Sequence, residues 1–294
     1  MKIVLLGKNG QLGWELQRTL APLGEIVALD CPEIDLVQTD QACRIMREIR
    51  PEVIVNATAY TAVDRAESEA ELAMAINGLA PGKLAQTAAE LEAVFIHYST
   101  DYVFDGEKGS AYLESDAPNP LSVYGASKLA GEQAIAEVGD VYLILRTSWV
   151  YSLRRDSFVT KVLGWARQNR TLRVVTDQVS SPTWARMLAE VTGLLLAKGS
   201  PNIRSWIGER KGLYHLAGSG FASRYEWAQA IIQHDPRRDE QIVEELQPAL
   251  TKEFPTLAER PLNSCLDCSL FYERFGLRLP DWEQALKLAM EQIH

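Results

Sequence analysis

The sequence predicts an α/β protein with a doubly wound parallel sheet of the Rossmann type, followed by a smaller C-terminal α/β part. Three observations lead to this prediction. Short apolar, β-branched runs alternate with amphipathic segments, a glycine-rich turn follows the first run, and the alternation becomes irregular beyond residue 150. Strands of a parallel sheet are continuous apolar runs because helices cover both faces of the sheet.

The first half of the chain contains the regular alternation. We expect buried strands at Ile3–Leu6, Ile26–Leu29, Val53–Asn56, Val94–Tyr98 and Tyr142–Leu145. We expect helices between them at Gln11–Leu20, Gln41–Arg50, Glu69–Glu92 and Ala126–Val138. Pro51 follows the second helix and Ser68 precedes the third, as helix boundaries require. Pro81 and Gly82 lie inside the third stretch and leave its continuity open.

The second half has weaker patterns, with Pro and Gly in the connections. Two strands are expected around one helix, and two further helices begin near Ser223 and Asp281; the strands and the enclosed helix are Leu172–Thr176, Gly212–Leu216 and Thr183–Ala197. We therefore expect a dinucleotide-binding domain at residues 1–151, to which 180–217 returns. The substrate-binding part is then formed by 152–179 and 218–294.

Composition excludes several classes of protein. The net charge of −9 argues against a nucleic-acid-binding surface, which needs clustered Lys and Arg. A membrane-spanning helix would need a run of about 18 apolar residues, and the sequence has none. The 4 cysteines are too sparse for a disulfide framework, so we expect a cytoplasmic protein. Cys265 and Cys268 form a CxxC, but no second pair completes a zinc site.

The glycine-rich turn predicts a dinucleotide site. Gly7, Gly10 and Gly13 follow the first expected strand and open the first expected helix. Glycines allow a tight turn and a close approach of the backbone to a pyrophosphate, whose charge is favoured by the helix N-terminus. The glycine pattern alone is common in loops, and the strand before it and the helix after it make it specific.

A carboxylate follows the second expected strand. Asp30 lies at the distance from the glycine turn at which an acid accepts hydrogen bonds from the adenosine ribose and repels a 2′-phosphate. A solvated turn acid is the alternative interpretation. Asp35 and Leu36 are expected to bracket the adenine.

A tyrosine and a lysine predict acid–base chemistry. Tyr124 and Lys128 are four residues apart in an expected helix, so both lie on one helical face. A free tyrosine, with a pKa near ~10, is a poor acid at neutral pH unless a cation lies close. Thr100 follows the fourth strand, at the edge where parallel sheets place their ligands. Thr100, Tyr124 and Lys128 beside a hydride donor could reduce a ketone or oxidise an alcohol.

Seven motifs together resemble one enzyme family over nearly the whole chain. They are GKNGQLG at 7–13, NATAYTAVDRAES at 56–68, HYSTDYVFDG at 97–106, YGASK at 124–128, RTSWVY at 146–151, SPT at 181–183 and RPLNSCLD at 260–267. The glycine turn and the tyrosine–lysine pair resemble the extended short-chain dehydrogenase/reductase superfamily. YSTDYVFDG and RTSWVY resemble, within it, the dTDP-4-dehydrorhamnose reductases.

This resemblance implies an activity. NADPH or NADH would deliver hydride to C4 of a dTDP-linked deoxysugar, dTDP-4-dehydro-L-rhamnose, giving dTDP-L-rhamnose for cell-surface polysaccharide biosynthesis. Tyr124 would protonate the ketone oxygen and Thr100 would tune that transfer. Lys128 would lower the pKa of the tyrosine and hold the nicotinamide ribose.

The resemblance also implies binding residues. The cofactor would contact Gly10, Gln11 and Leu12 at its pyrophosphate, and Ala59, Tyr60, Thr61 and Tyr98 in its cleft. The sugar would meet Thr100, Asp101 and Trp149, although a strand-end tryptophan is also an ordinary core residue. Arg260 is a weaker candidate for the substrate diphosphate, because a guanidinium binds phosphate bidentately; an ordinary surface residue before Pro261 is the alternative interpretation.

Three alternatives to this activity remain. A regulatory relative that binds NADP without catalysis would be expected to lack part of the tyrosine–lysine pair, which is intact here. An epimerase or dehydratase of the superfamily is a second alternative, but a dehydratase needs an acidic pair, and Tyr102 follows Asp101. A reductase of another nucleotide-linked 4-keto-6-deoxyhexose stays open.

We predict no metal site. Some members of the family dimerise around magnesium through acidic residues, but Arg186 stands where the partner of Glu15 is expected. A cation there would repel magnesium and could form an ion pair with Glu15, so we expect a monomer or a homodimer held by other contacts. The histidines have no ligand spacing, and we interpret them as structural: His97, His215, His234 and His294.

Overall fold

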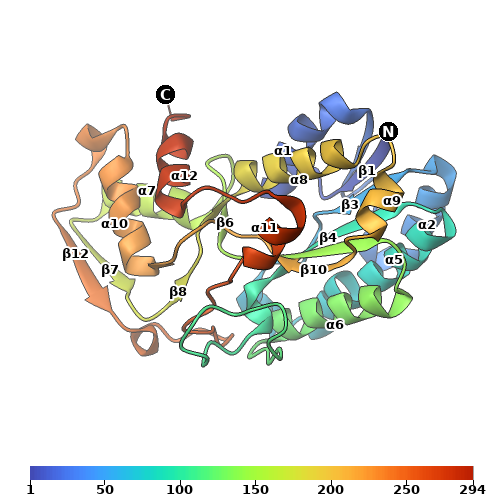
Figure 1. Ribbon diagram of the computed structural model, residues 1–294. Helices are drawn as coiled ribbons and strands as arrows, with labels where there is room; N and C mark the ends of the chain where they lie inside the picture. Colours follow the sequence, from blue (N-terminus) through green and yellow to red (C-terminus); the bar gives the residue numbers. More distant parts are fainter. Residues whose placement is uncertain (294) are drawn as a thin grey trace.

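The computed structural model describes residues 1–293 and has a six-stranded parallel sheet as its largest element (Figure 1). The strand order is β10-β5-β4-β3-β1-β2. The strands are β1 (Lys2–Leu6), β2 (Glu25–Leu29), β3 (Val53–Asn56), β4 (Val94–Thr100), β5 (Tyr142–Thr147) and β10 (Gly212–His215). Each neighbouring pair is parallel, which confirms the predicted fold class.

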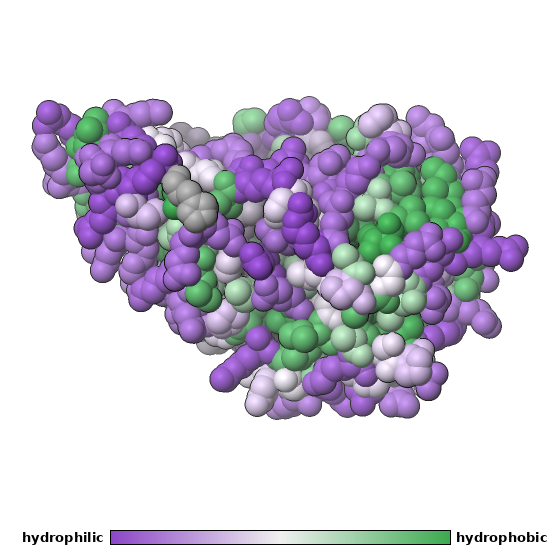
Figure 2. All heavy atoms as spheres, turned by 90° about the horizontal axis from the view of Figure 1, so that it is seen from above, coloured by the Kyte–Doolittle hydropathy of each residue, from purple (hydrophilic) through white to green (hydrophobic). Residues whose placement is uncertain are grey.

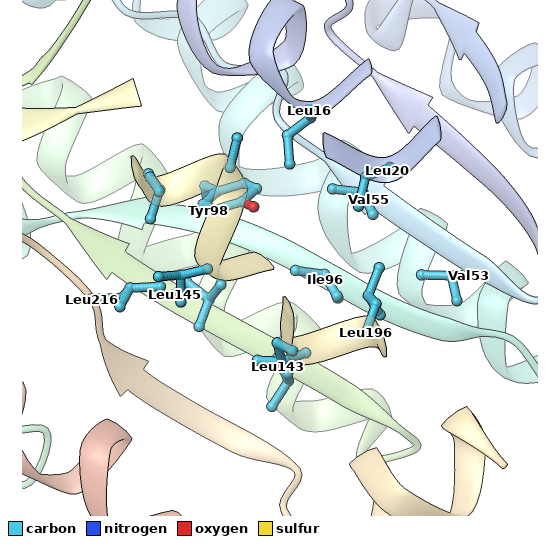
Figure 3. Packing of buried hydrophobic residues seen from close by; sticks show 14 of the residues in the cluster. Leu16, Leu20, Val53, Val55, Ile96, Tyr98, Leu143, Leu145, Leu196 and Leu216 are labelled. Carbon is cyan, nitrogen blue, oxygen red and sulfur yellow. The ribbon is translucent and has the colours of Figure 1, made fainter. Parts of the chain in front are cut away.

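Helices cover both faces of this sheet, as the continuous apolar strands require. One face packs against α1 (Gln11–Leu20), α8 (Ala185–Gly199), α9 (Ile203–Gly208) and α11 (Ser269–Phe275). The other face packs against α2 (Thr39–Ile49), α5 (Ala80–Glu90) and α6 (Val123–Val138). Side chains alternate along each strand, so Ile3 and Leu5 join the first core while Val4 and Leu6 join the second. Figure 3 shows the first core closely packed.

The third expected helix continues through its proline. Short α3 (Val63–Ala66) and α4 (Ala70–Ala73) precede a π-helical segment, Met74–Leu79, which runs directly into α5. Pro81 lies in the first turn of α5, directly after the π-helical segment, so the N–H that it lacks falls where the ordinary i→i−4 bonding pattern is already changed. The helix is therefore continuous, with a local change of winding.

The C-terminal part has its own core. Around Trp227 and Leu286 pack α7 (Phe158–Gln168), α10 (Arg224–His234) and α12 (Trp282–Met290). Three two-stranded sheets join it: β7 (Thr171–Val175) with β12 (Glu245–Ala249), β8 (Val179–Ser180) with β11 (Ala222–Ser223), and β6 (Val150–Tyr151) with β9 (Thr183–Trp184). The sequence patterns did not predict α7, α9, α11 or β12.

The chain crosses between the two parts more than once. After β9 it forms α8, which packs against α1, and then β10, which extends the large sheet beside β5. These contacts support our proposal that residues 180–217 belong with the cofactor-binding part.

The molecular surface is mostly hydrophilic when seen from above (Figure 2). Its apolar residues gather mainly over the half that holds the six-stranded sheet. Within residues 1–293, no helix has both the length and the apolar character needed to cross a membrane.

A buried ion pair attaches α6 to β5. Arg146 donates two hydrogen bonds to Glu132, over 2.9 and 2.6 Å, and the two side chains are only 4% and 3% exposed. Removing one partner leaves the other charge buried without compensation. We predict that Glu132→Ala lowers the free energy of unfolding by about 3–5 kcal/mol, measured by urea denaturation.

The matched control is Glu90, whose ion pair with Arg47 is nearly half exposed on both sides. Glu90→Ala should cost only about 0–1 kcal/mol. Equal losses in the two variants would contradict the assigned role of the buried pair.

Candidate active site

One cavity of about 770 Å³ opens at the carboxyl ends of the central strands. The structure brings most of the predicted site residues together in its wall: Gly7, Gly10, Gln11, Leu12, Asp30, Ala59, Thr61, Tyr98, Thr100, Asp101, Tyr124, Lys128 and Trp149. Five others lie outside the wall: Gly13, Asp35, Leu36, Tyr60 and Arg260.

The turn between β1 and α1 is shaped for an anion. Gly7 has a φ of +86°, and a Cβ there would lie 2.9 Å from the backbone of Ala57. The N-cap of α1 is Gly10, with no side-chain cap and no acidic residue in the first turn. The first N–H groups of α1 can therefore donate to a ligand phosphate, and the helix dipole favours its charge.

Gly13 has a different role from its two neighbours in the motif. A Cβ at Gly13 would lie 1.9 Å from the carbonyl oxygen of Gly7. Gly13 therefore allows α1 to pack closely on the turn, and the structure does not place it against the cavity.

Asp30 lies just after β2 and holds the turn as well as lining the cavity. Its Oδ2 accepts the N–H of Asn9 over 2.9 Å, and its Oδ1 accepts the N–H of Cys31 over 2.9 Å. A carboxylate has about four acceptor positions, so capacity for a ribose hydroxyl remains. The sequence did not reveal the contact with Asn9.

The other adenine and cleft candidates have partners within the protein. Asp35 accepts the N–H of Val37, and Leu36 is buried in the core against α2 and α5. Tyr60 is buried, and its hydroxyl donates to Glu69 over 2.5 Å. Their predicted contacts with the cofactor lack support from the cavity wall.

Thr100, Tyr124 and Lys128 all line the cavity. Ser122 caps α6 by accepting the N–H of Gly125, which places Tyr124 in the first turn of the helix. Thr100 is the last residue of β4. The amine of Lys128 donates to the carbonyl oxygen of Tyr98 over 2.6 Å.

Burial has the largest effect on the pKa values of Tyr124 and Lys128. It raises the pKa of Tyr124 above its usual value, and the hydroxyl of Thr100 acts in the opposite direction. Burial lowers the pKa of Lys128 to about 8, and the charge of Glu132 opposes that shift. The expected lowering of the tyrosine pKa by Lys128 stays a prediction, because burial has the stronger effect here.

Asp101 is a buried carboxylate with several donors. It is 2% exposed, and its Oδ2 accepts hydrogen bonds from Ser148, Ser180 and Ser264 over 2.9, 3.1 and 2.5 Å. Thr100 donates to Oδ1 over 3.2 Å. Burial raises the pKa of Asp101, and these hydroxyls lower it. The carboxylate expected to meet the sugar is thus already engaged, and it orients Thr100.

Trp149 lies on the wall of the cavity in a strained conformation. Its φ is +41°, a left-handed value that is rare for a bulky residue. The ring stacks on Trp227 with centroids 5.5 Å apart, and the guanidinium of Arg224 lies 3.6 Å from the centroid of Trp149. Such strain persists only where the surroundings enforce it, and here Trp227 and Arg224 hold the ring in place.

The arginines that line the cavity do not include Arg260, the arginine predicted to bind phosphate. Arg260 forms an ion pair with Asp64 over 2.7 Å, away from the wall. Arg155 and Arg224 line the cavity instead. Arg155 donates to the carbonyl oxygen of Asn9 over 2.5 Å, so its guanidinium lies on the glycine turn. The sequence offered only an adjacent arginine pair in a loop as a signal for Arg155.

Comparisons with known proteins agree with this geometry. A family model described as the RmlD substrate binding domain matches residues 1–294. The dTDP-4-dehydrorhamnose reductase of Burkholderia thailandensis is 42% identical over 100% of this chain and 99% of its own. The chain belongs to the dTDP-4-dehydrorhamnose reductase family.

Solved structures give the same result. A dTDP-4-dehydrorhamnose reductase from Clostridium acetobutylicum has a TM-score of 0.90 and 32% identity, covering 99% of both chains. The enzyme from Bacillus anthracis, solved in complex with NADP, has a TM-score of 0.89, 32% identity and the same coverage. The chain is an NAD(P)H-dependent oxidoreductase of this family.

Glu15 and Arg186, the two positions considered for a magnesium site, lie on α1 and α8, which pack against each other. Burial raises the pKa of Glu15, and the charge of Arg186 lowers it. The ion pair of Arg186 joins Glu190 over 2.9 Å, where we had expected Glu15 as the partner. Glu190 lies one turn further along α8, within easy reach of the arginine. Residues 1–293 contain no group of three or more His, Cys, Asp or Glu side chains suited to a metal ion.

We predict that activity and oligomeric state do not depend on magnesium, because Arg186 places a cation beside Glu15. EDTA dialysis followed by an activity assay and light scattering measures both. Loss of activity, or dimerisation that magnesium restores, would overturn this prediction.

Proposed function

We propose that this protein catalyses the NAD(P)H-dependent reduction of the C4 ketone of dTDP-4-dehydro-L-rhamnose to dTDP-L-rhamnose, a step in nucleotide-sugar biosynthesis. The observation that carries the proposal is the full-length match to dTDP-4-dehydrorhamnose reductases. The placement of Thr100, Tyr124 and Lys128 at one cavity supports it.

The residues of the cavity fit a dinucleotide. The uncapped start of α1 would hold the pyrophosphate, with Arg155 as a second phosphate donor, and Asp30 would accept from the adenosine ribose. Lys128 would donate to the nicotinamide ribose. When bound, the nicotinamide supplies the hydride that reduces the ketone carbon.

The protein itself supplies the proton. Tyr124 would donate its phenolic proton to the ketone oxygen, and Thr100 would hydrogen-bond the same oxygen. Arg224 beside Trp149 would receive the substrate diphosphate, in place of Arg260, which is paired with Asp64. Trp149 would pack against the sugar.

One alternative keeps the chemistry and changes the sugar. Another nucleotide-linked 4-keto-6-deoxyhexose, reduced by the same residues, is the second candidate. Incubation with NADPH and a panel of dTDP-, GDP- and UDP-4-keto sugars separates the two. Elimination chemistry is disfavoured, because Tyr102 follows Asp101 and packs edge-on against Tyr124 where a second acid would be needed.

The catalytic proposal predicts that Tyr124→Phe lowers kcat by roughly 10²–10⁴-fold, because it removes the proton donor. Cofactor affinity should change little, and titration of NADPH fluorescence measures it. Lys128→Met should impair both turnover and cofactor binding. Full turnover in the phenylalanine variant would exclude Tyr124 as the acid.

The cofactor proposal is that both NADH and NADPH are used, with Asp30 opposing the 2′-phosphate of NADPH. Asp30→Asn removes the charge and retains an oxygen for the turn, whereas Asp30→Ala removes both. Both variants should shift the ratio of kcat/KM values toward NADPH. A ratio that stays constant in both variants would mean that Asp30 does not face the ribose.

A further inference from the structure

His97 lies in the interior of β4 and contacts the predicted catalytic lysine. It is fully buried, and its Nε2 lies 3.0 Å from the Nζ of Lys128. Its Nδ1 lies 3.1 Å from the Nδ2 of Asn56, which ends β3. Burial, together with the neighbouring Lys128, holds the pKa of His97 well below its usual value, so the ring is neutral and carries one proton.

The backbone decides which nitrogen of His97 carries that proton. The N–H of Thr58 donates to the Oδ1 of Asn56 over 3.1 Å, and a backbone N–H can only donate. The amide of Asn56 is therefore oriented with its NH₂ group toward His97. Because that group is a donor, Nδ1 of His97 must accept, and the ring proton resides on Nε2.

This assignment determines what Lys128 must do. The N–H on Nε2 of His97 points to the Nζ of Lys128, so only the neutral form of Lys128 completes a hydrogen bond there. An ammonium group has three donors and no lone pair, whereas a neutral amine has one. The same Nζ can still donate to the carbonyl oxygen of Tyr98.

The surroundings of Lys128 allow a neutral amine. From α6 the charge of Glu132 acts on it, and that carboxylate is engaged by Arg146 of β5, while Tyr124 lies one turn earlier on the same helix. From β4 it meets His97 and a backbone carbonyl. Burial lowers the pKa of Lys128 to about 8, so both of its forms are accessible near neutral pH.

We propose that Asn56 and His97 are positioning residues that stabilise Lys128 as a neutral amine after it has passed a proton to Tyr124. The proposal rests on the proposed reductase function. In that reaction Tyr124 would give its proton to the ketone oxygen, and the ammonium of Lys128, which lines the same cavity, would supply the proton that restores the phenol, through water between the two groups. The resulting amine accepts from Nε2 of His97 until solvent supplies a new proton. The proton balance closes, and His97 itself keeps its proton.

The first experiment needs no activity. Nitrogen-15 NMR of histidine-labelled protein distinguishes the two neutral tautomers, and His97→Gln identifies the signal. We expect a neutral His97 with its proton on Nε2 between about pH 6 and 9. A proton on Nδ1, or an imidazolium, would overturn the proposal. If the expected tautomer is found but the protein reduces no 4-keto sugar, the proposed function is wrong. The hydrogen bonds from Asn56 through His97 to Lys128 are then still confirmed.

The second experiment moves the ring proton of His97 from Nε2 to Nδ1. Asn56→Asp still accepts the N–H of Thr58 but offers an oxygen to Nδ1, which draws the ring proton there and leaves Nε2 as an acceptor for an ammonium. In the wild type, kcat/KM for NADPH should fall as the pH rises through about 8, the pKa of Lys128. In Asn56→Asp the fall should move up by about one pH unit or more.

The matched control is Asn77→Asp. Asn77 is equally buried and hydrogen-bonds Tyr60 and Ser127, so the control adds a buried carboxylate beside α6 without touching His97. Its pH profile should stay near that of the wild type. An unmoved profile in Asn56→Asp, or an equal shift in both variants, would overturn the proposal.

Discussion

The burial of the Lys128 amine is the constraint on which the geometry of the active site depends. The residue is 1% exposed, and a charged amine without partners at that depth would cost several kcal/mol. Its partners are the carbonyl oxygen of Tyr98 and the ring of His97, both on β4. The amine therefore fixes α6 against β4 and sets Tyr124, one helical turn earlier, beside Thr100. The next turn of α6 is fixed to β5 through Glu132.

A second buried charge joins segments that are distant in the sequence. Oδ2 of Asp101 accepts from Ser264, which is 163 positions away, and from Ser148 and Ser180. Ser148 follows β5, Ser180 ends β8 and Ser264 belongs to the C-terminal segment. Because all three donate to one oxygen, a single carboxylate holds these segments together at the cavity wall. Neutral hydroxyl donors satisfy it without an ion pair.

Much of the fold and part of the site could be predicted because their signals are local. Apolar strands, the glycine turn and the four-residue spacing of Tyr124 and Lys128 depend on neighbours in the sequence. His97 could not be recognised as a lysine partner, because that contact depends on the register of β4 against α6. Arg260 is an opposite case: its charge suggested a phosphate ligand, the fold places Asp64 beside it, and its role in binding stays a prediction.

The charges of the cavity explain how a chain of net charge −9 can bind anionic ligands. Repulsion from distant carboxylates is screened within about 8–10 Å at physiological salt, so affinity depends on nearby donors. Lys8 is neutralised by Glu33. Arg155 and Arg224 instead rest on a backbone carbonyl and on aromatic faces, and neither forms an ion pair within residues 1–293. A carbonyl or an aromatic face orients a guanidinium without cancelling its charge. Both arginines therefore line the cavity without being held in an ion pair, one at the glycine turn and the other beside Trp149.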